Sequence, residues 1–204
     1  MRRPRNRGVV RATIAGVSTA ALRTLRTGAP RRGWSAASET SLVRAAQRGS
    51  TEAFAELFRR HWPRAHRAAW LVVHDAAAAE DVAQEAFLAA LRALDRFDRR
   101  RPFGPWLHRI VVNRAIDYAR AREQRREVTD AGVEPPALDR PDAPGDDVVA
   151  ALSALPPDQR AVIVMRHLLG FTPGEIASAL GLPRGTVNSR LRRGLDGLQE
   201  AVER

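Results

Sequence analysis

The sequence predicts an all-α protein made of two small helical domains, and three observations support this prediction. Aromatic residues make up 5% of the 204 residues, and β-branched residues are sparse beside Ala, Leu and Arg, so helix is favoured over strand. Apolar residues recur at helical spacing along two long stretches of the chain. Between these stretches, residues 128–147 hold four Pro, two Gly and six acids against one Arg. Such a composition buries little surface and favours an acidic, flexible linker.

The charge is divided unevenly along the chain. The formal net charge is +11, from 34 Lys+Arg and 23 Asp+Glu, and all of these bases are Arg. Residues 1–37 hold nine Arg and no acid, which is typical of a basic, disordered N-terminal tail. A first domain at 38–127, the acidic linker at 128–147 and a second domain at 148–204 follow. The basic balance favours nucleic acid or another polyanion as a partner.

Several classes of function are disfavoured. The chain has no Cys, which rules out disulfides, thiolate catalysis and Cys-ligated zinc. No stretch approaches the roughly 18–20 apolar residues of a membrane span. The weakly apolar run 12–22 superficially resembles a secretory signal, but Arg11, Thr13 and Ser18 make a basic arm the better interpretation. We therefore expect no enzyme activity, no catalytic residue, no metal and no cofactor, in a cytoplasmic protein without membrane insertion.

The first domain is expected to contain three main helices, at about 51–72, 76–94 and 103–122, after a short apolar stripe around Leu42. Ser50 supplies a hydroxyl cap for the first of them, and Asp75 caps the second. Pro63 is expected to kink or divide the first helix. A short polar loop at 98–102 precedes the third.

One face of the expected helix 76–94 is a candidate partner surface. At 100° per residue its apolar side chains fall within an arc of roughly 140°. Asp81, Glu85 and Leu88 cluster on the opposite side, with Gln84 beside them. A single exposed Leu is often without function, but its ring of charges here favours a surface formed by Asp81, Gln84, Glu85 and Leu88.

Residues 98–122 have the composition of a single-strand-binding surface. Arg follows phosphates, aromatic rings accept unstacked bases, and Asn reads a base edge. The candidates are Arg99, Arg100, Arg101, Phe103, Arg109, Asn113 and Arg120. Trp106 is expected in the core, because Leu107 and Ile110 continue its stripe, whereas core packing and base stacking remain about equally open for Phe103.

The stretch 172–191 predicts a helix-turn-helix. Thr172 caps the first helix, Pro173 takes its first position, and Glu175 lies in its first turn. Gly181 supplies the turn, where a positive φ is cheap for Gly, and Pro183 or Arg184 opens the second helix.

The outward residues of that second helix are suited to DNA. Arg, Asn, Ser and Thr are the types that a recognition helix uses on base edges and phosphates. The candidates are Arg184, Thr186, Asn188, Ser189, Arg192 and Arg193. An ordinary helical hairpin with a polar face is the alternative, and the number of agreeing positions favours DNA binding.

With these motifs in order, the chain resembles the extracytoplasmic-function group of bacterial RNA polymerase sigma factors, in the sigma-70 family. Residues 185–194 and 154–160 resemble the family's region 4. Residues 79–88 resemble its region 2 signature, and 106–113 with Asp117 and Arg120 resemble its promoter-melting helix. Asn188 stands where the family usually has Lys or Arg, which puts one DNA contact in doubt.

The resemblance implies a function and partners. Residues 81–88 would dock on core RNA polymerase, residues 99–120 would bind the −10 element as a separated strand, and residues 184–193 would bind the −35 element. An anti-sigma factor is a further expected partner. The alternative is a stand-alone helix-turn-helix regulator, but the sequence shows no dimerisation element for reading paired half-sites.

Overall fold

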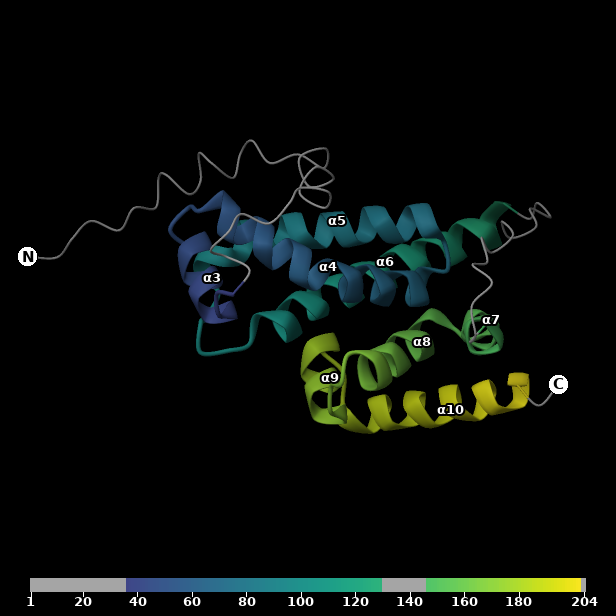
Figure 1. Ribbon diagram of the computed structural model, residues 1–204. Helices are drawn as coiled ribbons and strands as arrows, with labels where there is room; N and C mark the ends of the chain where they lie inside the picture. The colour runs from purple at the N-terminus through teal and green to yellow at the C-terminus, as the bar shows by residue number, and fades with distance from the viewer. Residues whose placement is uncertain (1–35, 130–145, 203–204) are drawn as a thin grey trace, which may run out of the picture. The chain divides into compact units, whose positions relative to one another are not determined.

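The computed structural model describes residues 36–129 and 146–202, and every regular element in these ranges is helical, which confirms the all-α prediction. The elements in chain order are α3 (Glu39–Ala46), α4 (Thr51–Val73), α5 (Ala76–Ala93), η1 (Leu94–Arg96), α6 (Phe103–Thr129), α7 (Asp146–Ala154), α8 (Pro157–Ile163), η2 (Val164–Leu168), α9 (Pro173–Leu180) and α10 (Arg184–Val202), as Figure 1 shows. The expected tail lies outside the described residues except for its last two positions, and so does most of the expected linker. Helix α6 continues to Thr129 and α7 begins at Asp146, so helix enters both ends of that linker.

The helix starts follow local capping signals. Ser38 Oγ accepts from Ser41 N (3.2 Å) at α3, and Ser50 Oγ accepts from Ala53 N (3.2 Å) at α4. Asp75 Oδ1 accepts from Ala78 N (2.9 Å) at α5. Each cap satisfies a backbone N–H that has no partner inside its own helix, and such a cap contributes roughly 0.5–2 kcal/mol. The caps predicted at Ser50 and Asp75 are confirmed.

Pro63 does not divide α4, which runs unbroken from Thr51 to Val73. A Pro inside a helix removes one backbone hydrogen bond and costs about 3 kcal/mol. Burial on both sides of Pro63 offsets this cost, because Phe58 (1% exposed) precedes it and Ala65 (0%) follows it. The expected division at Pro63 is therefore wrong, and a kink there stays a prediction.

The described residues form two compact units. The first contains residues 36–63 and 84–107, and the second contains residues 64–83, 108–129 and 146–202. In the first unit, the Phe58 ring lies 5.0 Å from Trp62 and 4.6 Å from Phe87, between ring centroids. Aromatic packing therefore joins α4 to α5 at the centre of this unit.

In the second unit, α10 packs closely on α7 and α8. A Cβ added to Gly194 would lie 2.6 Å from Ile163 Cδ1, and one added to Gly197 would lie 2.8 Å from Leu155 Cδ2. A side chain at either position would require Ile163 or Leu155 to shift, so Gly allows the close approach of α10 at these two positions. Residues after α8 form the wider π turn η2, in which Leu169 N donates to Val164 O (3.0 Å).

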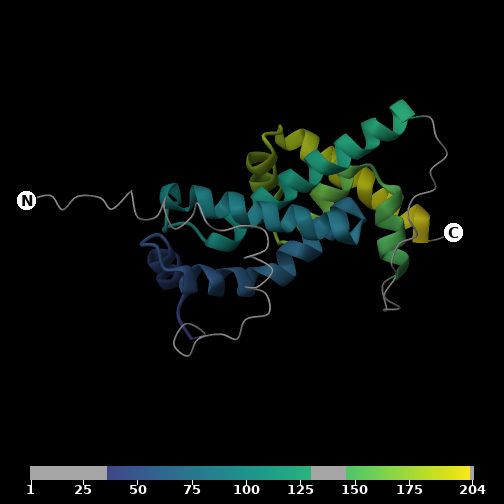
Figure 2. The same cartoon turned by 90° about the horizontal axis from the view of Figure 1, so that it is seen from above.

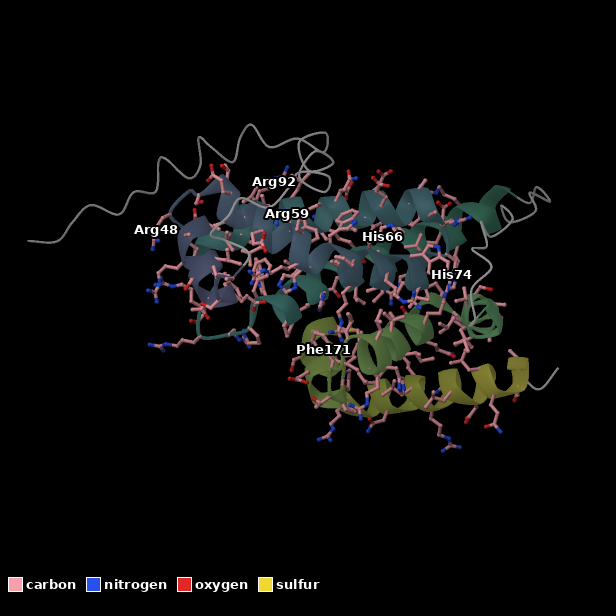
Figure 3. The ribbon with its side chains drawn as sticks, in the orientation of Figure 1. Arg48, Arg59, His66, His74, Arg92 and Phe171 are labelled. Atoms are coloured by element: carbon pink, nitrogen blue, oxygen red, sulfur yellow. The ribbon has the colours of Figure 1, made fainter. Side chains whose placement is uncertain are left out.

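The π turn leads directly into the next helix. Phe171, labelled in Figure 3, is 8% exposed and donates its N–H to Met165 O (3.0 Å). Its buried ring fixes the chain just before Thr172, where the cap of α9 lies. The tight turn from α9 to α10 can be followed in Figure 2.

Candidate nucleic-acid interface

Helix α5 presents three of its four candidate residues on its polar side. Asp81 and Glu85 are exposed and Leu88 is half-buried. These three side chains, one turn apart, are called the docking face below. Gln84 is 1% exposed, so its expected place on this face is wrong. Helical spacing sets Gln84 at the edge of the apolar arc, beside the buried Phe87, and packing covers it.

Three consecutive Arg residues occupy a tight, exposed turn before α6. Asp98 organises this turn, because its Oδ1 accepts from Arg100 N (3.0 Å) and its backbone O accepts from Arg101 N (3.0 Å). The Arg99, Arg100 and Arg101 side chains are all exposed, and they are called the arginine turn below. The three adjacent guanidinium groups supply positive charge and up to five N–H donors each. Together they can hold more than one phosphate.

Phe103 does not belong to the exposed surface, and its expected role in base stacking is corrected. It is 1% exposed, and its ring lies 5.8 Å from Phe97, 5.5 Å from Trp106 and 5.3 Å from His61, between centroids. A base could stack on Phe103 only if these rings separated. Phe103 therefore acts as a core residue that supports the arginine turn, and the half-buried Trp106 packs beside it as predicted.

The other candidates of this region share one face of α6. Residues 109, 113 and 120 are spaced by four and seven positions, which keeps them on the same side of a helix. Arg109 and Arg120 are exposed, and Asn113 is half-buried. Within the second unit, Asn113 Nδ2 donates to Ala179 O (3.4 Å) and Arg120 Nη2 pairs with Asp158 Oδ1 (2.7 Å). A nucleic-acid strand on this face would have to replace those contacts.

The helix-turn-helix forms as predicted. Thr172 Oγ1 accepts from Glu175 N (3.3 Å), and Glu175 Oε2 accepts from Thr172 N (2.7 Å), which completes a capping box. The hydrogen bond from the Thr172 backbone, with that from its hydroxyl, lowers the pKa of Glu175. Gly181 has φ 65° and ψ 33°, and it ends α9 in the left-handed region. Val187, fully buried, anchors α10 behind the turn.

The outward side of α10 carries the six predicted residues. Arg184, Asn188, Arg192 and Arg193 are exposed, and Thr186 and Ser189 are half-buried; these six are called the reading face below. Arg184, Asn188 and Arg192 follow one another at intervals of four residues and form a continuous strip. The Arg192 side chain is 86% exposed, and among the described residues its ion-pair partner is Asp196, whose Oδ2 lies 3.9 Å away. Its guanidinium is thus available to a base edge or a phosphate.

Two side chains that the sequence did not single out contact the residues on either side of the arginine turn. They are Glu39 and Gln47, which lie at the start and directly after the end of α3. These contacts join residues that are 47 to 64 positions apart in the chain, so no local pattern could have indicated them.

Two absences hold for the described part of the chain. No helix there is long and apolar enough to cross a membrane. Nor do its His, Asp and Glu side chains form any group of three or more that could hold a metal ion.

Comparison with known proteins places these surfaces in a family. Residues 57–126 match the family model of sigma-70 region 2, and residues 146–196 match that of sigma-70 region 4. The chain is 33% identical to the extracytoplasmic-function RNA polymerase sigma factor SigE of Mycolicibacterium smegmatis, over 71% of this chain and 60% of that protein. It is 33% identical to the RNA polymerase sigma-H factor of Pseudomonas aeruginosa, over 81% of this chain and 94% of that protein.

A solved structure agrees with this placement. The sigma factor RpoE of Bartonella quintana, in complex with the anti-sigma factor NepR, is similar with a TM-score of 0.59 and 26% identity, over 75% of this chain and 98% of that one. Both family regions are present in the family's order, and both contain the surfaces described above. The chain therefore belongs to the extracytoplasmic-function group of the sigma-70 family, whose members are promoter-recognising transcription initiation factors.

Proposed function

We propose that this sigma factor divides initiation among its three surfaces. The docking face binds core RNA polymerase, the reading face binds the −35 element as duplex, and the arginine turn holds the separated non-template strand at the −10 element. Residues 38–127 and 148–204 act as the two functional domains, joined by the acidic segment 128–147. The observation that carries the proposal is the arginine turn, which presents three exposed guanidinium groups on a buried aromatic base.

We propose that this chain opens promoter DNA by binding the separated strand and that it catalyses no reaction. The sequence contains no Lys and hence no phosphate-binding loop of the Gly-x-x-x-x-Gly-Lys type. Opening then depends on holding the separated strand more tightly than the duplex. Unstacking a base costs a few kcal/mol, and contacts from the arginine turn and from Arg109, Asn113 and Arg120 offset this cost.

The partners follow from the same surfaces. Core RNA polymerase and promoter DNA are the partners of the docking face and of the two DNA-binding surfaces. The relative from Bartonella quintana is in complex with an anti-sigma factor, which supports the proposal of an anti-sigma partner for this chain. A protein that works on polymerase and chromosomal DNA in a bacterium works in the cytoplasm, where we place it.

The alternative of a stand-alone helix-turn-helix regulator is not favoured. It would leave the region 2 match, at residues 57–126, without a role. Transcription in vitro with core polymerase on a promoter library tests the two functions directly. A sigma factor selects paired upstream and downstream elements and starts transcription only with core polymerase. A stand-alone regulator would instead form a specific duplex complex without polymerase.

A further inference from the structure

We propose that Glu39 and Gln47 are positioning residues for the arginine turn and that they hold it at both of its ends. This inference rests on the proposed function of that turn in binding the separated strand. Both residues precede residue 57, where the match to sigma-70 region 2 begins.

Gln47 holds the entry of the turn. Its Nε2 donates to Leu94 O and to Phe97 O, both at 2.9 Å. Phe97 is the last residue before Asp98, on which the arginine turn is built. One side-chain amide therefore satisfies two carbonyl groups where the chain leaves η1, and it fixes the direction in which the turn begins.

Glu39 holds the exit of the turn. Its Oε1 accepts from Phe103 N (2.9 Å), and its Oε2 lies 2.9 Å from His61 Nε2. Phe103 is the first residue of α6, and the first N–H groups of a helix have no partner within it. The carboxylate satisfies one of these groups and adds negative charge where the helix dipole favours it.

Helix α3, which begins at Glu39 and is followed directly by Gln47, packs within the first unit (Figure 1). Leu42 and Val43 are 0% and 2% exposed, and Ala45 and Ala46 are buried as well. Between the two anchored ends, the Phe97 and Phe103 rings pack edge to face at 5.8 Å. The exposed Arg residues thus project from a base that is held on each side by a hydrogen bond from a rigid element.

A fixed base matters for binding a strand. A turn that is already ordered loses less conformational entropy on binding than a mobile one. Removing either anchor leaves all three Arg charges present but lets their base move. The anchors should therefore affect the affinity for a separated strand, without affecting the affinity for core polymerase.

The test measures binding of the holoenzyme, assembled with the full chain, to a fork-junction DNA whose non-template strand is single-stranded at the −10 element. Gln47→Met removes both donors at similar length, and Glu39→Ala removes both acceptors. Each should weaken strand binding by about 3–10-fold, the range expected for one net hydrogen bond. Glu39→Gln keeps an acceptor for Phe103 N and should retain most of the binding. Glu52→Ala, in the exposed first turn of α4, is the matched control and should bind normally.

A triple variant, with Arg99, Arg100 and Arg101 all changed to Ala, separates this inference from the proposed function. If the triple variant loses strand binding and the anchor variants do not, the inference is overturned and the proposed function stands. If the triple variant binds normally, the proposed function fails first, and the inference falls with it.

The triple variant also distinguishes positioning from general stability. In a protein that already carries the three Arg changes, Glu39→Ala should cause no further loss of strand binding, because the anchor acts only through the Arg side chains. An equal additional loss there would mean a general structural effect and would overturn the inference. Helical circular dichroism and core affinity are measured for each variant. If Glu39→Ala lowers the helical signal or the core affinity, the other two variants decide. Strand binding that is retained by Glu39→Gln and lost by Gln47→Met supports the inference. Any other pattern overturns it.

Discussion

The exposure of single side chains decides which candidates can meet a partner. Leu88 remains half-buried on the polar side of α5, whereas Gln84 is covered. Phe103 is covered too, by rings that come from three different segments. Helical periodicity predicts the side of the helix on which a residue lies, but it does not predict how deeply neighbouring elements bury that residue. Residues at the edge of an apolar arc are therefore the ones that spacing alone misplaces.

Leu88 offers a test of the docking face. Leu88→Asp should weaken binding to core polymerase by at least about 30-fold, because a charge without a partner in an interface costs ~2 kcal/mol or more. Ala77→Asp, at an exposed position near the start of the same helix, is the control and should bind normally. Affinity is measured by fluorescence anisotropy with labelled protein, and helical content by circular dichroism. Unchanged affinity of the Leu88 variant would remove α5 from the interface.

The reading face can be tested one residue at a time. An Arg of α10 that reads a base should, when changed to Ala, cost about 1–3 kcal/mol and relax the preference at one position of the −35 element. An Arg that contacts a phosphate should instead weaken binding to all sequences alike and reduce the salt dependence. Glu200→Ala, exposed near the far end of α10, is the control. Promoter selection with Arg184, Arg192 and Arg193 variants checks this, and identical profiles for all three would contradict a reading face.

At the scale of elements, local chemistry sets where helices start and stop. Thr172, Glu175 and Gly181 define α9 as the sequence predicts, because caps and left-handed turns depend on residues within one turn of each other. An unbroken helix across Pro63 follows no such local signal. Burial of residues on both sides of Pro63 offsets the lost backbone hydrogen bond, and such burial cannot be predicted from local sequence.

Two Gly residues near the turn of the helix-turn-helix make a matched pair. Gly181 has a positive φ of 65°, and a Cβ there would meet nothing within 4 Å, so Gly181→Ala should cost only the backbone strain of about 1–2 kcal/mol. Gly185, in the first turn of α10, also has open space around it and no positive φ. Gly185→Ala should therefore stabilise the protein by about 0.4–1 kcal/mol. Chemical denaturation of both variants measures the free energies of unfolding, and equal effects would contradict the assigned turn geometry.

His74, at the end of α4, makes the stability of the folded protein depend on pH. Burial, with the positive charge of Arg160, lowers the pKa of His74 to about 4, while an unfolded His takes up a proton near pH 6.5. Between these values the unfolded chain binds more protons, so stability should fall as the pH drops from 6.5 towards 4. His74→Asn tolerates the positive φ of 52° at this position and should make the fall shallower. Parallel stability curves for wild type and variant between pH 6.5 and 5 would contradict this effect.

At the scale of the whole chain, the sequence was sufficient to predict an all-α protein with both family regions. The caps, the apolar stripes and the helix-turn-helix are local, and they lie where they were expected. The anchors Glu39 and Gln47 were not foreseen, because their partners come from a distant part of the chain. The arginine turn itself could be predicted as basic, but only the folded structure shows the buried aromatic base beneath it.

The proposed role of the arginine turn is to open promoter DNA by holding the separated strand. Permanganate footprinting of holoenzyme that carries the Arg99–Arg101 triple Ala variant tests this most directly, on a duplex promoter and on the same promoter with a pre-melted bubble. We expect normal binding to core polymerase, loss of thymine reactivity on the duplex, and at least partial recovery on the bubble. Normal thymine reactivity on the duplex with this variant would contradict the claim and place the strand-holding surface elsewhere in the protein.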